Sequence, residues 1–131
     1  METYELENLV RAALIGNEEL MSVLPLGERS IFHHVAPTIE QKRYPILVYS
    51  PISDVPVLAG DNSEIAHLVT IRIHVIALQK RFEVDEQNFI AACKLVKKIM
   101  TGLNFARRQT TPFIDDGKIM TILDFVKGVL S

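Results

Sequence analysis

The strongest constraint on the fold is the alternation of apolar and polar residues over 65–78. From Val69 onward, one set of alternating positions is entirely apolar and includes Val69, Ile71, Ile73 and Val75. The other set starts polar and turns apolar at Ile76 and Leu78. Because successive side chains of a strand point to opposite faces of a sheet, this pattern predicts a long strand with one buried face. It also predicts that the end of the strand is buried on both faces.

Two other segments carry a helical pattern. Apolar residues recur at spacings of three and four over 3–24 and again over 85–103, which predicts an amphipathic helix in each. Gly16-Asn17 is expected to interrupt the first helix, and Asp85 is expected to cap the second.

Further strands are predicted on both sides of the first one. Residues 30–35 favour a short strand and residues 44–49 a clearer one, since β-branched and aromatic residues dominate there. Pro45 cannot donate a ladder hydrogen bond and is expected at the strand's start or on a sheet edge. Pro51 is expected to limit its far end.

The C-terminal part of the chain has the pattern of a β-hairpin. Two extended apolar segments, 105–114 and 118–126, flank the sequence Asp115-Asp116-Gly117. An Asp-Gly step between such segments is typical of a tight hairpin turn. The same turn accounts for the two adjacent carboxylates without a catalytic role.

These elements predict one α+β domain over residues 1–131. The expected architecture is a two-layer sandwich, with an antiparallel or mixed β-sheet and the two main helices packed on one face. A chain of 131 residues with 48% hydrophobic content has enough apolar material for one core. The second face of such a sheet and its edges need cover, which a partner subunit could give.

Charge and hydropathy argue against two classes of partner. The formal net charge is −2, which gives no general attraction to nucleic acid or to an anionic membrane. No apolar run approaches the roughly 18 residues of a membrane span, and the acidic N-terminus does not resemble a signal peptide. Cys93, the single cysteine, lies in the apolar helical pattern and is expected to be a small core residue of a protein made in a reducing cytosol.

No catalytic, cofactor or metal site is predicted. His33 and His34 are adjacent, so in a strand they are expected on opposite faces, unable to bind one metal ion together. His67 and His74 are seven residues apart, which also separates their faces. Ser30 lacks the flanking glycines of a nucleophile elbow.

The connection over 54–64 is the best candidate for an interaction surface, because loops often carry binding residues. The predicted contact residues are Asp54, Val55, Val57, Leu58, Asp61, Asn62 and Glu64. The alternative is a solvated hairpin tip whose turn is formed by Gly60-Asp61-Asn62.

The order of the motifs resembles one protein family. A helical N-terminus ending in LMSVL is followed by IFHHVAP, by YPILVYSPISDVP, by the acidic GDNSE and by HLVTIRIHVIAL. A helix over 85–103 and a terminal hairpin then follow. In this order the chain resembles the tail-completion, or tail-terminator, proteins of long-tailed bacteriophages and prophages, and the related head-tail joining proteins.

The resemblance implies a structural role without enzymatic activity. Similar proteins form a homo-oligomeric ring, commonly a hexamer, at the head-proximal end of the tail tube. The implied partners are further copies of the chain, the tail tube protein and the head completion or connector protein. The implied location is the head-tail junction of the virion, after synthesis in the host bacterial cytoplasm. A cytoplasmic ligand-binding or regulatory α/β module is the alternative function.

Overall fold

The computed structural model describes residues 1–35, 44–78, 83–115 and 117–130. Two helices open the chain, α1 (Thr3–Ile15) and α2 (Glu18–Val23), followed by a single 3-10 turn, Gly27–Ser30. The strands are β1 (Ile31–His33), β2 (Ile46–Leu58) and β3 (Glu64–Leu78). Helix α3 (Glu83–Gly102) then precedes the hairpin of β4 (Ala106–Asp115) and β5 (Lys118–Leu130).

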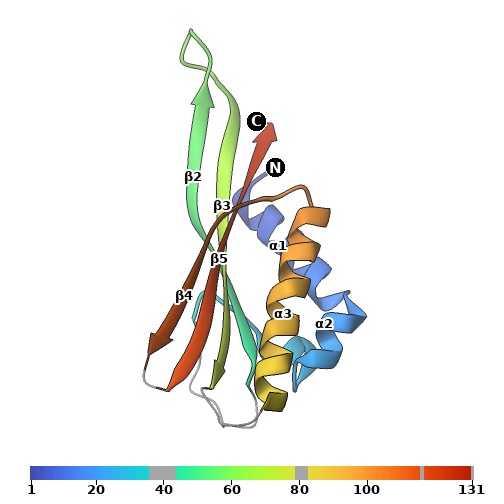
Figure 1. Cartoon of the computed structure of the whole chain (residues 1–131). Helices are drawn as coiled ribbons and strands as arrows, with labels where there is room; N and C mark the ends of the chain where they lie inside the picture. Colours follow the sequence, from blue (N-terminus) through green and yellow to red (C-terminus); the bar gives the residue numbers. More distant parts are fainter. Residues whose placement is uncertain (36–43, 79–82, 116, 131) are drawn as a thin grey trace.

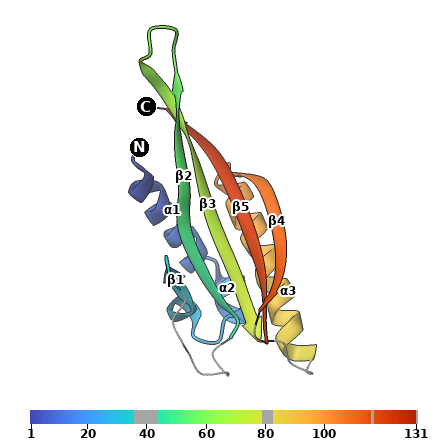
Figure 2. The same cartoon turned by 90° about the vertical axis from the view of Figure 1, so that its left-hand side faces the viewer.

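The five strands form one mixed sheet in the order β1-β2-β3-β5-β4. β1 pairs in parallel with β2, whereas the other neighbours are antiparallel. All three helices lie behind this sheet in Figure 2, so the molecule has two layers. The predicted α+β sandwich is therefore confirmed, with β3 at the centre of the sheet.

The helix-facing side of the sheet holds the main core. Val69, Ile71, Ile73 and Val75 are all 0% exposed, as the alternation over 65–78 predicts. They pack with α1, α2 and α3 through the buried side chains Leu6, Val10, Leu14, Leu20, Ala92, Cys93, Val96 and Met100. The prediction that Cys93 is a core residue is confirmed, and burial raises the pKa of its thiol.

A second apolar cluster lies on the opposite face, at the end of β3 remote from its start. Ile46 of β2 pairs with Ile76 of β3, and Val48 pairs with His74. Tyr44, Ile46, Val48 and Ile76 are all buried there. The end of the strand is therefore buried on both faces, as predicted.

Two local predictions need correction. Pro51 does not end β2, which continues to Leu58 through a bulge between Pro51 and Ser53. This is tolerated because β1 pairs only with residues 47–49, so β2 is an edge strand at Pro51 and needs no second ladder bond. Asp85 lies inside α3, which begins at Glu83, and does not precede the helix.

Other boundaries lie near the predicted ones, although β5 continues past Val126 to Leu130 and β1 is shorter than the predicted strand over 30–35. The first helical segment is interrupted at Gly16-Asn17, where the Asn17 side chain accepts a hydrogen bond from the Leu20 amide at 2.9 Å and caps α2. Pro45 precedes β2. Asp115 pairs with Lys118 to close the predicted terminal hairpin; Asp116 lies outside the described residues.

Candidate functional site

The distal halves of β2 and β3 project beyond the helical layer (Figures 1 and 2). We call residues 52–68 the β-arm. At the base of the β-arm, β3 also pairs with β5. This pairing ends within the arm at Ala66, which lies opposite Leu130. The predicted connection over 54–64 is thus mostly strand, with a turn only at 59–63. A register that keeps pairing almost to the tip makes the β-arm an ordered projection.

Large apolar side chains are exposed along the β-arm. The exposed fractions are 45% for Ile52, 52% for Val55, 36% for Val57, 53% for Leu58, 52% for Ile65 and 44% for Leu68. Val55 pairs with Leu68 and Val57 with Ala66, so these four share the sheet face that carries no helix. Six exposed apolar side chains in one projection are more than scattered surface residues, and such patches mark interaction sites.

The opposite side of the arm base is polar and tied to the N-terminus. Asp54 accepts a hydrogen bond from the Thr3 hydroxyl at 2.5 Å and contacts Nδ1 of His67 at 2.7 Å. Nε2 of His67 faces the carbonyl oxygen of Met1 at 3.1 Å. Both ring nitrogens face oxygen acceptors, and this arrangement favours the doubly protonated, charged imidazole.

The same contacts shift the pKa values of His67 and Asp54. The hydrogen bond to Asp54 is the main cause that raises the pKa of His67. The hydroxyl of Thr3 is the main cause that lowers the pKa of Asp54, with His67 adding to the effect. The predicted interface residue Asp54 therefore fixes the arm to α1.

The turn at the tip is closed by its own side chains. The Ala59 amide donates to the Ser63 carbonyl at 2.8 Å, and the Asn62 amide donates to the Ala59 carbonyl at 2.9 Å. Asn62 takes a positive φ of 68°, which asparagine tolerates better than most residues. Asp61 accepts hydrogen bonds from the amide and the hydroxyl of Ser63, and these bonds lower the pKa of Asp61.

Prolines protect the edges of the sheet against added strands. Among the described residues β2 has no neighbour on its outer side beyond residue 49, and Pro51 and Pro56 lie in that part. Pro112 lies in β4, the strand at the other edge. A proline removes a backbone donor and discourages pairing with a further strand. The exposed surface of the β-arm therefore lies on its side-chain face and not along its strand edge.

All seven predicted contact residues lie on the β-arm, but they differ in what they do. Val55, Val57 and Leu58 present exposed apolar surface. Asp54 and Asp61 serve internal hydrogen bonds, Asn62 forms the turn, and Glu64 pairs with Leu58 in the ladder. Ile52, Ile65 and Leu68 were missed. Ile52 and Ile65 fall at register shifts, and no local sequence signal gives their exposure.

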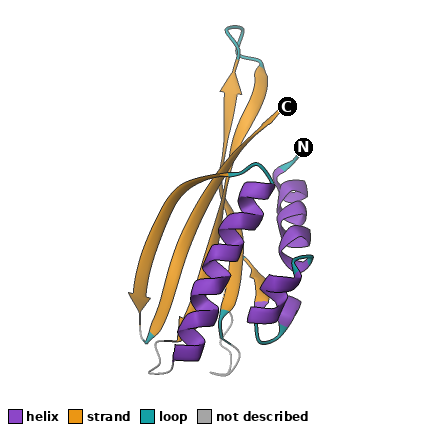
Figure 3. Cartoon of the chain, turned by 45° about the vertical axis from the view of Figure 1, so that its right-hand side comes forward, coloured by secondary structure: helices purple, strands orange, loops and turns teal. Residues whose placement is uncertain are grey.

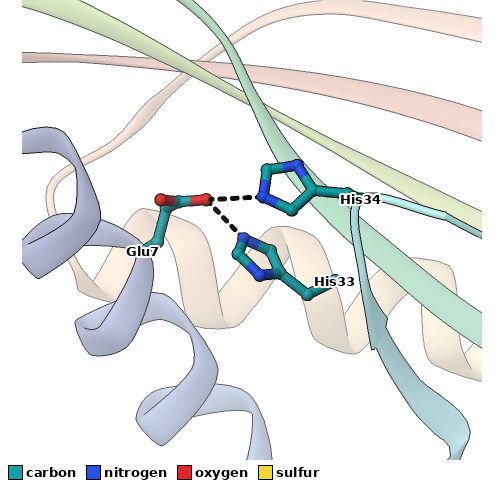
Figure 4. A group of neighbouring side chains, drawn as sticks. All are labelled: Glu7, His33 and His34. Atoms are coloured by element: carbon teal, nitrogen blue, oxygen red, sulfur yellow. Dashed lines mark hydrogen bonds and ion pairs between the residues drawn. The ribbon is translucent and has the colours of Figure 1, made fainter.

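The two adjacent histidines lie differently from the prediction. His34 has a φ of 70°, which breaks the strand alternation directly after His33. Both imidazoles therefore point at Glu7 of α1 (Figure 4). His33 Nε2 lies 2.5 Å and His34 Nε2 lies 3.9 Å from the Glu7 Oε1 atom. The prediction that these histidines face opposite sides, which excluded a shared metal ion, is wrong.

His74 lies on the helix-free face, opposite in direction to His67, as predicted from their spacing. With His34, Val48, Ile76 and Met120 it lines a cavity of about 230 Å³. Its Nδ1 atom is buried and has no hydrogen-bond partner among the residues that the structure describes. Burial, and secondly the charge of Arg72, lower the pKa of His74, so its neutral form is favoured.

Comparison with known proteins adds no assignment. No protein-family model matches the sequence, and no curated protein matches it. Within the described residues, every helix is too short or too polar to cross a membrane.

Proposed function

We propose that this protein is a structural subunit of phage tail assembly, of the tail-completion or tail-terminator type. In this proposal copies of the chain form a ring, commonly a hexamer in similar proteins, at the head-proximal end of the tail tube. The ring stops growth of the tube and joins it to the head connector. The motif order suggests the family, and the β-arm is the observation that supports an assembly role.

The β-arm has the properties of an element that docks on another subunit. It projects past the helical layer (Figure 3), and its helix-free face carries Val55, Val57 and Leu68, all exposed. The hydrogen bonds that Asp54 accepts from Thr3 and His67 hold the base of the arm in one orientation. A preorganised apolar surface loses little conformational entropy on binding.

Ring closure requires a heterologous contact between neighbouring copies. One surface of each subunit must meet a different surface of the next. A projection from one end of a two-layer domain suits such a contact, since it can reach across a neighbour. The proline-bearing edges disfavour open-ended strand addition, which would produce fibres.

The test is the assembly state of the purified protein, alone and with tail tube protein, measured by native mass spectrometry and electron microscopy. The expected result is a ring or a capped tube. Val55→Lys combined with Leu68→Lys should abolish assembly and leave the circular dichroism spectrum unchanged. Ile90→Lys is the matched control, because Ile90 is 50% exposed on α3 and far from the arm in sequence. A chain that stays monomeric with tube and connector proteins contradicts the proposal.

A second candidate function, a ligand-binding or regulatory module, rests on one cavity. Met1, Glu2, Asp54, Glu64 and His67 line about 330 Å³ at the base of the β-arm. This volume is at the lower end of small-molecule sites, which are mostly apolar. Its polar lining is largely engaged internally, as the contacts of Asp54 and His67 show. A thermal shift with small cationic metabolites, without association with tail components, would favour this function.

A further inference from the structure

We infer that Glu7, His33 and His34 form a binding site for a divalent transition-metal ion of the Zn²⁺ class. Each residue offers one ligand atom, and the three atoms all lie within 4.8 Å of one another. Ligands bonded to Zn²⁺ at about 2.0–2.2 Å in a tetrahedron are roughly 3.3 Å apart. Small side-chain rotations, without a change of backbone, therefore bring the three atoms to bonding distance.

The backbone at His34 is built to place both imidazoles on one side. The Val35 amide donates to the His33 carbonyl at 2.9 Å, across a three-residue turn centred on His34. With φ at 70°, this is the rare and strained form of such a turn. Strain of this kind is kept where the surrounding structure or a function requires it. Here its consequence is that consecutive side chains converge on Glu7.

The His33 ring is also held in place by stacking on Tyr49, and the His34 ring lies tilted against it. The His33 ring lies 3.6 Å from the His34 ring and 4.7 Å from the Tyr49 ring, measured between centroids. Tyr49 is buried in β2 and is the register partner of His33. Preorganised ligands lose less side-chain entropy on binding a metal ion.

The position of the carboxylate favours a cation. Glu7 is 8% exposed, and its ion-pair partners among the described residues are the two imidazoles, with no lysine or arginine of that part of the chain. A buried carboxylate is costly unless it is paired or coordinates a metal ion. The His33 and His34 side chains are 40% and 54% exposed, so an ion can enter from solvent.

The ligand set selects the class of ion. Two imidazole nitrogens and one carboxylate oxygen suit Zn²⁺ and its neighbours, whereas Mg²⁺ and Ca²⁺ prefer oxygen ligands. Three protein ligands leave one position of a tetrahedral ion for water or for a group from another molecule. The ion would join α1 to the end of β1, and so fix the first helix to the sheet.

The test uses the full-length protein treated with a chelator and then titrated with Zn²⁺ by calorimetry, with Co²⁺ absorption as a reporter of the ligand set. We expect saturable binding of one ion per chain and a rise in Tm. Glu7→Gln and His34→Asn should each weaken binding by more than about tenfold. His34→Asn is the more informative variant, because asparagine tolerates a positive φ and the side chain is exposed.

His67→Gln is the matched control, since His67 lies outside the cluster and should leave Zn²⁺ binding unchanged. The inference is contradicted if the unaltered protein does not bind Zn²⁺ saturably, or if His34→Asn binds as tightly as the unaltered protein. Neither result depends on ring assembly, because all three ligands belong to one chain and the titration measures binding per chain. The metal site and the proposed function can therefore fail separately.

Discussion

At the scale of single residues, one ion pair shows how burial decides the energetics. Arg72 of β3 is directly opposite Asp124 of β5. It donates from Nε to Oδ1 at 2.8 Å and from Nη2 to Oδ2 at 3.0 Å. The hydrogen bond to Asp124 is the main cause that raises the pKa of Arg72. The Arg72 side chain is 37% exposed, whereas that of Asp124 is only 10% exposed.

This asymmetry predicts unequal losses when either partner is changed. Arg72→Met should lower the free energy of unfolding by about 3 kcal/mol, because it leaves a buried carboxylate without its counter-charge. Asp124→Asn should cost only about 1 kcal/mol, since it keeps the shape and the guanidinium can reach water. Urea unfolding of both variants measures the difference. Equal losses would show that the burial of Asp124 does not decide how much stability the pair contributes.

At the scale of elements, α3 is attached to the sheet by one buried face. Ala92, Val96 and Met100 are each 0% exposed, and Cys93 beside them is 8% exposed. A thiol reacts as the thiolate and only when a reagent reaches it. The burial that raises the Cys93 pKa therefore slows the reaction in two ways.

Cys93 should accordingly report the opening of α3. In the native protein we expect its reaction with a disulfide reagent to be at least about 100-fold slower than in urea-unfolded protein. Lys94→Cys in a Cys93→Ala background is the control, because position 94 is exposed on the same helix. That thiol should react rapidly without unfolding. Similar rates for the two native thiols would mean that α3 does not pack on the sheet as described.

The elements also show which parts of the fold can be predicted from sequence patterns. Periodicity predicted α3 and β3 because each has one fully buried face. It failed at Pro51, since whether a strand lies at an edge depends on its neighbours and not on its own residues. It failed at His34, because a positive φ breaks the alternation of a regular strand. Seven residues of the β-arm were predicted and Ile52, Ile65 and Leu68 were missed, because the side that each residue faces depends on the bulges near Ile52 and Ile65.

For the whole molecule, two histidines on opposite faces of β3 influence stability in opposite directions. Asp54, with smaller contributions from Met1 and Glu64, raises the pKa of His67. The stability that the protonated His67 contributes is fully present below about pH 6.5. It is lost as the pH rises through the raised pKa of His67. Burial and the nearby Arg72 lower the pKa of His74, against a smaller opposite effect of Asp124. Because the unfolded chain takes up a proton at His74 more readily than the folded protein does, His74 lowers the free energy of unfolding as the pH falls below about 6.5.

The two effects should separate in single variants studied by chemical unfolding between pH 5 and pH 8. His67→Gln should be most destabilised relative to the unaltered protein near the acid end, with the difference shrinking as the pH rises. His74→Leu should gain stability relative to the unaltered protein as the pH falls, because it removes an imidazole that is buried neutral. His33 and His34 are present in all three proteins, so any effect that they have on the pH profiles cancels when the variants are compared. Parallel pH profiles for all three proteins would mean that neither contact at β3 governs the protonation of its histidine, and the link between the arm base and the N-terminus would lose its electrostatic basis.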